Sequence, residues 1–263
     1  MKLQQSNIEF YQEHGYLIVE DVFSSDEIDA LSIETETLLK NPNDALVHEQ
    51  DQHTVRSING PHFVSQTMNQ LMRTPKILEP TKQLLDGDVY LHQYKINTKR
   101  AFDGDVWEWH SDYWFWHKED GMPEPEALTA VIFLDDVNEF NGPMCLIPKS
   151  QNYRLSDELH SRPYGAQDGG ENWQITTAKE LKYKLSREFL AQMINTYGIK
   201  SAQGKKGSVL FFHSNLLHSS SYNSSPWDRR GIFISYNRVS NCLLEMPSPR
   251  PEFLASRNFT PLI

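Results

Sequence analysis

The stretch WEWHSDYWFWHKEDGMP, residues 107–123, is the most informative part of the chain, because it sets metal-ligating side chains in an aromatic run. His110 and Asp112 are two positions apart, so on a β-strand both side chains face the same way and can bind one ion together. His117 is out of phase with His110, and we expect it to be structural. The H-x-D spacing alone is a weak signal, because a chain with 10 histidines can contain it by chance.

A third ligand is expected in GSVLFFHSNLLHSSSYNSSPWDRRGIFISYN, residues 207–237. His218 is favoured over His213, because Ser220 and Arg229 follow His218 by 2 and 11 residues. A hairpin at the intervening Asn-Ser-Ser-Pro turn would place Arg229 beside the strand of His218. We expect His213 to be packed in the interior.

Two histidines and one carboxylate on one face of a metal leave open coordination positions, as in non-haem Fe(II) oxygenases. A guanidinium near such a metal suits a dicarboxylate cosubstrate, because its planar fork matches a carboxylate with two hydrogen bonds. A surface ion pair is the alternative role for Arg229. The complete set of residues is far more specific than any one part of it.

Composition narrows the classes of protein. A chain of 263 residues with 38% hydrophobic and 23% charged residues predicts one folded domain, residues 1–263. A net charge of −10 argues against nucleic-acid or anionic-membrane binding, and we find no apolar run of membrane-spanning length. Two cysteines outside any C-x-x-C pair predict reduced thiols and a cytoplasmic protein. The expected partner is a small molecule, and the expected assembly is a monomer or homodimer.

The order of elements predicts a mainly β fold with flanking helices. Residues 8–40 are expected to form helix, strand and helix, with Gly15 ending the first helix and a Ser24–Glu27 capping box starting the second. Residues 41–70 look like a loop, and a helix is expected over 68–85. Short β-rich runs follow from Val89, which favours a sandwich or barrel. They are interrupted by a lid or insertion at 151–204, with a loop over 162–174 and a helix over 178–194.

The chain resembles the phytanoyl-CoA dioxygenase (PhyH) superfamily of Fe(II)/2-oxoglutarate oxygenases, and within it the ectoine hydroxylase branch. The resemblance covers most of the chain but is poor over 41–87 and 151–204. It rests on the motifs HQYKIN, WHSDYWFWHKEDGMP, NEFNGPMCLIPKS and NLLHSSSYNSSPWDRR, and on the opening FYQEHGYLIVEDVFSSDEIDAL. It implies a double-stranded β-helix, or jelly roll, which uses Fe(II), 2-oxoglutarate and O2 to hydroxylate an unactivated C–H bond and releases succinate and CO2.

The resemblance also implies roles for individual residues. Iron would be bound by His110, Asp112 and His218. 2-Oxoglutarate would be held by Lys99, Ser220 and Arg229, with Asn97 nearby. The positions at which the ectoine branch contacts its substrate are Gln93, Trp116 and Thr129.

Two departures from the ectoine pattern suggest a different substrate. Trp114 and Phe115 stand where that branch has Glu-Thr, so a small hydroxyl and an acid are replaced by two large aromatic side chains. Arg238 stands where that branch has a small residue; it would bind a substrate carboxylate or form a structural salt bridge. Because some relatives hydroxylate free aliphatic amino acids such as L-leucine, we expect an amino-acid hydroxylase. The alternatives are an ectoine-type or carrier-bound acyl hydroxylase, and a cupin-like metal-binding protein without oxygenase activity.

Overall fold

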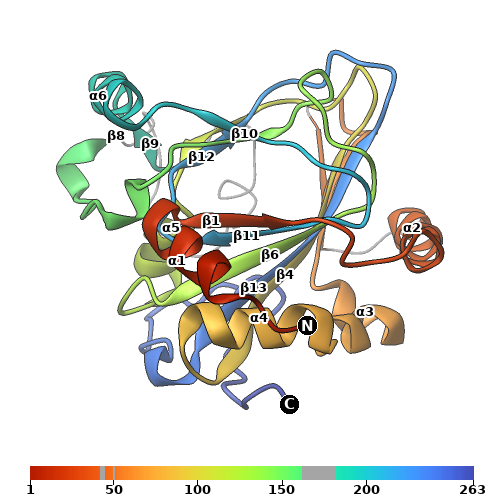
Figure 1. Ribbon diagram of the computed structural model, residues 1–263, viewed down its shortest axis with the longest axis horizontal. Coiled ribbons are helices and arrows are strands. Elements are labelled where there is room, and N and C mark those ends of the chain that lie inside the picture. The colour runs from red at the N-terminus through yellow and green to blue at the C-terminus, as the bar shows by residue number, and fades with distance from the viewer. Residues whose placement is uncertain (42–44, 50, 162–181) are drawn as a thin grey trace.

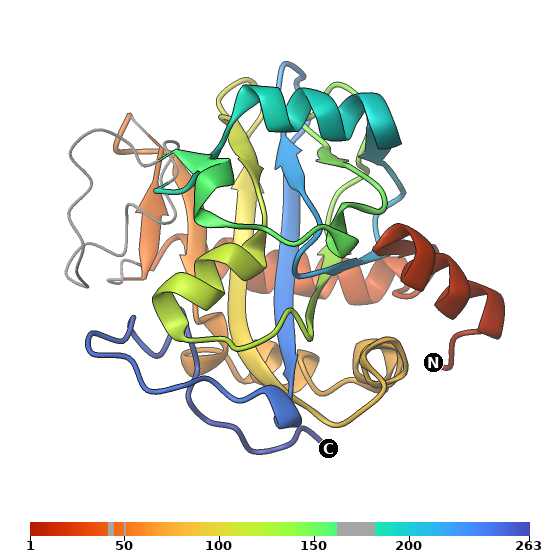
Figure 2. The ribbon, with the colours of Figure 1, turned by 90° about the vertical axis from the view of Figure 1, so that its left-hand side faces the viewer.

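The computed structural model describes residues 1–41, 45–49, 51–161 and 182–263. Two antiparallel sheets face each other, and the predicted jelly roll is confirmed (Figures 1 and 2). The larger sheet has the strand order β1 (Tyr16–Val19), β11 (Val209–His213), β6 (Ala127–Phe133), β13 (Arg229–Arg238), β4 (Val89–Lys99), β3 (Val55–Asn59) and β2 (Leu46–His48). The smaller sheet has the order β10 (Lys200–Ala202), β7 (Met144–Leu146), β12 (His218–Ser220) and β5 (Trp107–His110).

Helices flank the two sheets. In Figure 1, α4 lies against the outer face of the larger sheet, where it contacts β6 and β4. The α-helices are α1 (Gln5–His14), α2 (Ser25–Leu39), α3 (Gln66–Leu71), α4 (Pro75–Leu85), α5 (Asp112–Phe115) and α6 (Arg187–Tyr197). Short helical turns are η1 (Pro61–Phe63), the π-helical η2 (Trp116–Asp120), η3 (Ser150–Asn152), η4 (Asp157–Leu159) and η6 (Val239–Asn241), and a small ribbon pairs β8 (His160–Ser161) with β9 (Lys184–Leu185).

Alternation along the central strands gives the larger sheet two buried faces. On β13, Ile232 and Ile234 pack toward the flanking helices, whereas Phe233 packs between the sheets. On β4, Tyr94 and Ile96 belong to the same outer core. Because neighbouring side chains of a strand point to opposite faces, residues 93, 95, 97 and 99 of β4 point to the inner face. On this inner face Lys95, Asn97 and Arg229 line the cavity between the two sheets.

The N-terminal predictions are confirmed. The helix α1 ends at Gly15, which has a φ of 78°, a left-handed conformation that glycine adopts without steric cost. The helix α2 begins with the predicted capping box: Ser24 Oγ accepts a hydrogen bond from the Glu27 backbone, and the Glu27 side chain accepts one from the Ser24 backbone. This helix packs its apolar side chains into the outer core.

The prediction of a loop over 41–70 is wrong, because this segment contains β2, β3, η1 and the start of α3. β3 is hard to recognise because it buries Arg56, which forms an ion pair with Glu49 at 2.9 Å and so hides the apolar pattern of the strand. The helix expected over 68–85 is two helices. Thr74 adopts an extended conformation between them, since the residue before a proline, here Pro75, is disfavoured in helical conformation.

The segment predicted as a lid is described only in part. The loop predicted over 162–174 and the first residues of the helix predicted over 178–194 lie outside the described residues. The helix α6 begins only at Arg187, after an extended stretch, and Ser186 Oγ caps it by accepting a hydrogen bond from the Phe189 backbone. The assignments of a single domain and of a lid therefore stay predictions.

Candidate active site

Three residues from two strands and one helical turn form a cluster of metal-ligating atoms between the sheets. Nε2 of His110 lies 3.7 Å from Oδ1 of Asp112, and Nε2 of His218 lies 4.0 Å from the same oxygen. His110 and His218 are brought together because β5 pairs with β12 and places them opposite each other. One donor atom from each of the three residues lies within 4.8 Å of the others, a spacing that one metal ion can span.

The expectation that His110 and Asp112 share one strand is wrong. The strand β5 ends at His110, and Ser111 caps the short helix α5, of which Asp112 is the first residue. The helical turn still directs the carboxylate toward both imidazoles. Sequence periodicity missed this turn, because β-rich aromatic residues continue from β5 into α5 without a break.

Hydrogen bonds and burial prepare both imidazoles to bind a metal. Nδ1 of His110 lies 2.6 Å from the Glu108 carbonyl and Nδ1 of His218 lies 2.9 Å from the Leu216 carbonyl, so each ring donates at Nδ1 and leaves Nε2 free as a ligand. Burial lowers the pKa of His110 to about 3 and also lowers the pKa of His218. Both rings are therefore neutral at physiological pH, the form that binds a metal.

The carboxylate of Asp112 is kept ionised. Burial alone would raise its pKa, but electrostatic attraction, chiefly from the positive charge of Lys95, outweighs burial and lowers it. Two neutral imidazoles and one carboxylate form the donor set of a non-haem Fe(II) site, which leaves further coordination positions open.

Polar atoms without partners lie beside the cluster. Arg229, Ser220 and Asn97 all line the cavity between the sheets. Arg229 Nε, Ser220 Oγ and Asn97 Oδ1 are buried, and none has a hydrogen-bond partner in the described part of the chain. Burial lowers the pKa of Arg229 to about 10, so the guanidinium stays charged at neutral pH. Since a buried polar group without a partner is costly, these atoms are suited to a polar ligand. Arg229 Nε and Ser220 Oγ can donate to a carboxylate, whereas Asn97 Oδ1 accepts a hydrogen bond.

The predicted hairpin between His218 and Arg229 is wrong. The strand β12 pairs with β5 and β7, whereas β13 pairs with β4 and β6 in the opposite sheet. Residues 221–228 thus cross from one sheet to the other, and Arg229 reaches the cavity from the larger sheet while Ser220 reaches it from the smaller one. The polar turn residues are compatible with either connection, so spacing could not distinguish them.

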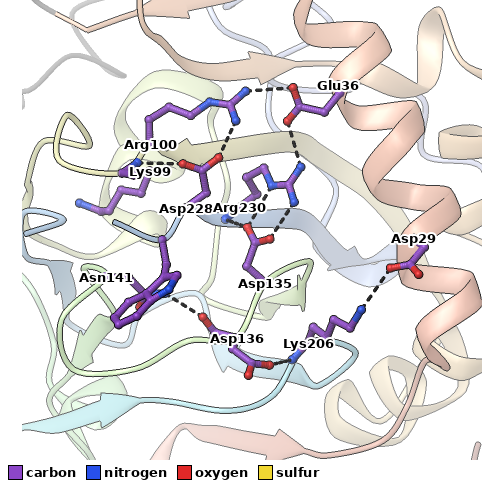
Figure 3. A network of polar contacts seen from close by, with 12 residues as sticks. Asp29, Glu36, Lys99, Arg100, Asp135, Asp136, Asn141, Lys206, Asp228 and Arg230 are labelled. Atoms are coloured by element: carbon purple, nitrogen blue, oxygen red, sulfur yellow. Dashed lines mark hydrogen bonds and ion pairs between the residues drawn. The ribbon is translucent and has the colours of Figure 1, made fainter. Parts of the chain in front are cut away.

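An ionic network outside the cavity secures the start of β13 (Figure 3). Arg230 binds Asp135 through two hydrogen bonds of 3.0 and 2.7 Å and also binds Glu36 of α2 at 2.9 Å. Arg100 links the same glutamate to Asp228. Since Arg229 and Arg230 are adjacent on a strand, anchoring Arg230 outside the sheet directs Arg229 into the cavity.

Lys99 lies opposite Arg229 in the pairing of β4 with β13, but it is not among the residues that line the cavity. Its Nζ donates hydrogen bonds to the backbone carbonyls of Ser221, at 2.5 Å, and Asp105. Burial, with repulsion from Arg229 and Arg56, lowers the pKa of Lys99 to about 6, so the amine carries little charge at neutral pH. Here it joins the loop after β4 to the crossing segment that leads to Arg229.

The residues predicted to contact the substrate do not all lie together at the cavity. Gln93 donates a hydrogen bond to the Leu254 carbonyl at 2.9 Å, and Thr129 is bonded to Ser235 at 2.8 Å; both lie on the inner face of the larger sheet but outside the cavity lining. Arg238 lies at the opposite end of β13 from Arg229, where it faces Glu126 at 3.6 Å. Its position fits the structural salt bridge that was the alternative for this residue.

The aromatic residues after Asp112 form a second core beside the metal cluster. Phe115 is edge-on to the His110 ring, at 6.1 Å between centroids, and contacts the Tyr183 ring at 5.1 Å. Trp116 packs against His92 at 4.7 Å, and Lys118 lies over the Trp114 ring at 4.8 Å. These side chains are buried with residues of α6, so the turn contacts the described part of the 151–204 segment.

The other histidines fit the roles expected for them. His117 Nδ1 lies 2.8 Å from the Met122 carbonyl, and His213 Nδ1 accepts a hydrogen bond from the Asn215 backbone at 3.0 Å. Neither belongs to the metal-ligating cluster, which among the described residues contains only His110, Asp112 and His218.

Sequence reasoning missed several residues of the cavity wall. Lys95 and Trp107 both line the cavity together with Asn97 and the metal ligands. The signal for Lys95 was present: it lies two residues from both Gln93 and Asn97 and must share their face of the strand. Further lining side chains are Met144, Phe212 and Phe233.

Comparison with known proteins matches this geometry. Residues 11–231 match the family described as phytanoyl-CoA dioxygenase (PhyH). The L-proline trans-4-hydroxylase of Streptomyces griseoviridis is 34% identical over 253 residues, which cover 96% of this chain and 92% of the relative. The ectoine dioxygenase of Bordetella parapertussis is 34% identical over 273 residues, with 97% and 83% covered. The structure of EctD from S. alaskensis with 2-oxoglutarate and 5-hydroxyectoine has a TM-score of 0.84 and 32% identity over 97% of this chain and 84% of that one.

The fold and the donor set define the chain as an Fe(II)/2-oxoglutarate-dependent dioxygenase, with O2 as the other cosubstrate. It belongs to the phytanoyl-CoA dioxygenase (PhyH) family. In the part of the chain that the structure describes, no helix is long and apolar enough to cross a membrane.

Proposed function

We propose that this enzyme hydroxylates an unactivated aliphatic C–H bond of a small free amino acid, with L-proline and L-leucine as the first candidates, and releases succinate and CO2. The main support is the similarity to L-proline trans-4-hydroxylase, which extends over 92% of that enzyme's length. The aromatic pair Trp114–Phe115, in place of the Glu-Thr of the ectoine pattern, is a second reason to favour an amino acid over ectoine.

His110, Asp112 and His218 are the proposed iron ligands. They fit the metal because both histidines expose Nε2 and because the carboxylate is ionised. When bound, iron and 2-oxoglutarate supply the oxidising chemistry that converts the C–H bond to C–OH. The protein's own contribution is to hold the reacting carbon close to the metal and to exclude water.

Arg229, Ser220 and Asn97 are the proposed contacts to 2-oxoglutarate. The buried Arg229 Nε and Ser220 Oγ, which have no partner among the described residues, supply donors to a carboxylate from both sheets at once. Asn97 would donate to it through its amide nitrogen, because its Oδ1 is an acceptor. A contact from Lys99 would require its Nζ to leave the carbonyls of Ser221 and Asp105. We therefore propose that Lys99 acts on the cosubstrate through the loops that it holds beside Arg229.

The substrate is proposed to lie between Phe115 and the inner face of the larger sheet. Phe115 is the aromatic residue of the α5 turn that contacts a metal ligand, so it would limit how a substrate approaches the iron. Trp114 and Trp116 are buried on either side and would set its orientation. Gln93 and Thr129 lie on the inner face beyond Lys95 and would need to exchange their present hydrogen bonds for substrate contacts.

The second candidate function is ectoine hydroxylation. It is favoured by the fold-wide similarity to EctD and by 35% identity to the ectoine dioxygenase of Sphingopyxis alaskensis over 94% of this chain. Nothing in the cavity specifically favours a carrier-bound acyl substrate. The alternative without oxygenase activity is set aside, because the chain belongs to an oxygenase family.

A substrate panel tests the proposal. The Fe(II)-loaded enzyme is incubated with 2-oxoglutarate, O2 and L-proline, L-leucine, other aliphatic amino acids or ectoine, and products are analysed by mass spectrometry and succinate assay. We expect one amino acid to gain one oxygen with one succinate released. Oxygen gain by ectoine alone would favour the second candidate and contradict the first.

We also propose a cytoplasmic enzyme that acts as a monomer or homodimer. The two cysteines in the described residues, Cys145 and Cys242, are free thiols, which suits a reducing compartment. Size-exclusion chromatography with light scattering would give the oligomeric state; a tetramer or larger assembly would contradict this proposal.

A further inference from the structure

Lys95 lies inside the cavity, where its charge lowers the pKa of Asp112, but it has no assigned contact to a ligand. It lies on the inner face of β4 opposite Phe233 of β13, and it lines the same cavity as the metal ligands. Its Nζ lies 5.6 Å from the Phe233 ring centroid and 5.9 Å from that of Trp107. In the described part of the chain, this Nζ makes no hydrogen bond and no ion pair within 4 Å, although Asp112 attracts it from further away.

The position of Lys95 separates it from the residues proposed to hold the cosubstrate. In the pairing of β4 with β13, Arg229 lies opposite Lys99, whereas Phe233 lies opposite Lys95. Four residues along a strand correspond to about 13 Å. Lys95 is therefore on the metal side of the cavity, between Asn97 and the proposed substrate contact Gln93.

The charges of the loaded site leave Lys95 without a counter-ion. Two positive charges on iron and one on Arg229 are balanced by the two carboxylates of 2-oxoglutarate and by Asp112. Both imidazoles are neutral, so the positive charge of Lys95 is the one that is not balanced. Burial lowers the pKa of Lys95, and an anion beside it would favour the charged form. A site of this composition is complementary to a ligand that brings one carboxylate.

We propose that Lys95 binds the carboxylate of the substrate and so fixes which carbon faces the iron. This inference rests on the proposed function, and it deepens it by naming the specificity-determining cation. The aromatic rings of Trp107 and Phe233 hold the lysine side chain in place and exclude water from the ion pair. Arg238, which the sequence suggested for the same role, lies at the other end of β13 beside Glu126.

Binding under anaerobic conditions tests the inference without relying on turnover. Isothermal titration calorimetry measures the binding of L-proline, L-leucine and ectoine to the enzyme loaded with Fe(II) and 2-oxoglutarate. The same measurement is made with L-prolinamide and L-leucinamide, which lack the carboxylate. For Lys95→Met we expect the dissociation constant of the best carboxylate probe to rise by about 10- to 100-fold, the usual effect of losing a charge-assisted hydrogen bond. The amides should bind wild type and Lys95→Met about equally. Lys95→Arg should recover part of the lost affinity.

Three controls separate the outcomes. The dissociation constant of 2-oxoglutarate for Lys95→Met should stay close to that of wild type, which also shows that the variant is folded. Lys200→Met removes an exposed lysine of β10 and should change nothing. Arg238→Met tests the rival cation, and an effect confined to this variant would overturn the inference.

Other outcomes distinguish this inference from the proposed function. In one outcome ectoine binds, no amino acid binds, and Lys95→Met weakens the binding of ectoine. The role of Lys95 then stands, while the amino-acid proposal fails. If Lys95→Met weakens 2-oxoglutarate instead of the probe, or if no carboxylate probe binds wild type, the inference is overturned.

Discussion

Arg229 and Arg230 are neighbours at the start of β13, yet their side chains lie in opposite environments. Arg230 lies outside the sheets, where Asp135 and Glu36 satisfy its guanidinium. Arg229 lies in the cavity, where its Nε has no partner among the described residues. The hydrogen bonds with Asp135 raise the pKa of Arg230, whereas burial lowers that of Arg229. Arg230 is thus satisfied by two carboxylates of the fold, whereas the described residues leave Arg229 Nε without a partner, which supports the proposal that Arg229 binds the cosubstrate.

The same contrast separates the two groups of histidines. His110 and His218 each use Nδ1 for a backbone carbonyl and leave Nε2 free beside Asp112. His213 accepts a backbone hydrogen bond and lies outside the metal-ligating cluster. His110 and His218 are buried and His213 is half-buried, and what distinguishes the first two is a free Nε2 directed at a shared point.

The largest expected effect comes from replacing a histidine of the metal-ligating cluster, compared with replacing a histidine outside it. His218→Asn should lose bound iron after desalting and lower succinate formation by more than about 100-fold, since loss of a mere partner of a ligand already costs about 10- to 100-fold. The matched variant His213→Asn should keep both. Metal analysis and a succinate assay measure the outcome, and iron retained by His218→Asn but lost from His213→Asn would reverse the assignment.

The next effect compares the two arginines directly. Arg229→Met should weaken 2-oxoglutarate binding by about 10- to 100-fold with little change in stability, because it removes charge-assisted hydrogen bonds to the ligand. Arg230→Met should remove the guanidinium that pairs with Asp135, while the backbone hydrogen bond to this carboxylate remains, and should lower the free energy of unfolding by about 1–3 kcal/mol. Titration of 2-oxoglutarate and urea unfolding separate the two effects. Equal loss of cosubstrate affinity in both variants would remove the distinction between the two sites.

A smaller effect is expected at the aromatic turn. Trp114→Glu combined with Phe115→Thr restores the residues of the ectoine pattern and should raise ectoine turnover relative to amino-acid turnover by about 10- to 100-fold, the usual range for a reshaped pocket. Competition between ectoine and the preferred amino acid, followed by mass spectrometry, gives the ratio. An unchanged ratio would show that selectivity is set elsewhere, for example at Lys95.

The smallest effect concerns the stability of the metal-free protein at low pH. Burial holds the pKa of His213 at about 4, below its ordinary 6.5, so between these values the unfolded chain binds protons more readily than the folded one. The contribution to stability is complete above about pH 6.5 and is lost as the pH falls toward 4. Thermal unfolding from pH 7 to 4.5 should show a shallower decline for His213→Asn than for wild type. The exposed residue His53 supplies the control, and an equal change in slope for His53→Asn would contradict this explanation.

Local patterns predicted the parts of the molecule in which sequence neighbours interact. The capping box at Ser24, the turn at Gly15 and the short β-rich runs from Val89 all depend on short-range chemistry, and they are confirmed. The iron cluster followed from His110, Asp112 and the spacing after His218. The same reasoning failed at Asp112, where an aromatic run that looks like a strand forms a helical turn.

The pairing of strands that are distant in the sequence could not be predicted from local patterns. The spacing between His218 and Arg229 is compatible with a hairpin or with a crossing between sheets, and only the paired strands show that it is a crossing. Arg238 and Lys95 carry the same charge, and which of them reaches the cavity depends on their positions along the paired strands. The strand β3 was missed because it buries a charged residue, Arg56, whose ion pair with Glu49 makes this burial possible.

The central claim is that this cavity couples 2-oxoglutarate oxidation to hydroxylation of a free amino acid. It is tested most directly by reaction with labelled ¹⁸O₂ and the best amino acid of the panel, with product and succinate measured together. We predict one labelled hydroxyl group on the amino acid for each succinate formed by wild type, and neither product with Asp112→Ala. Succinate formed without hydroxylated amino acid, across the whole panel, would contradict the account.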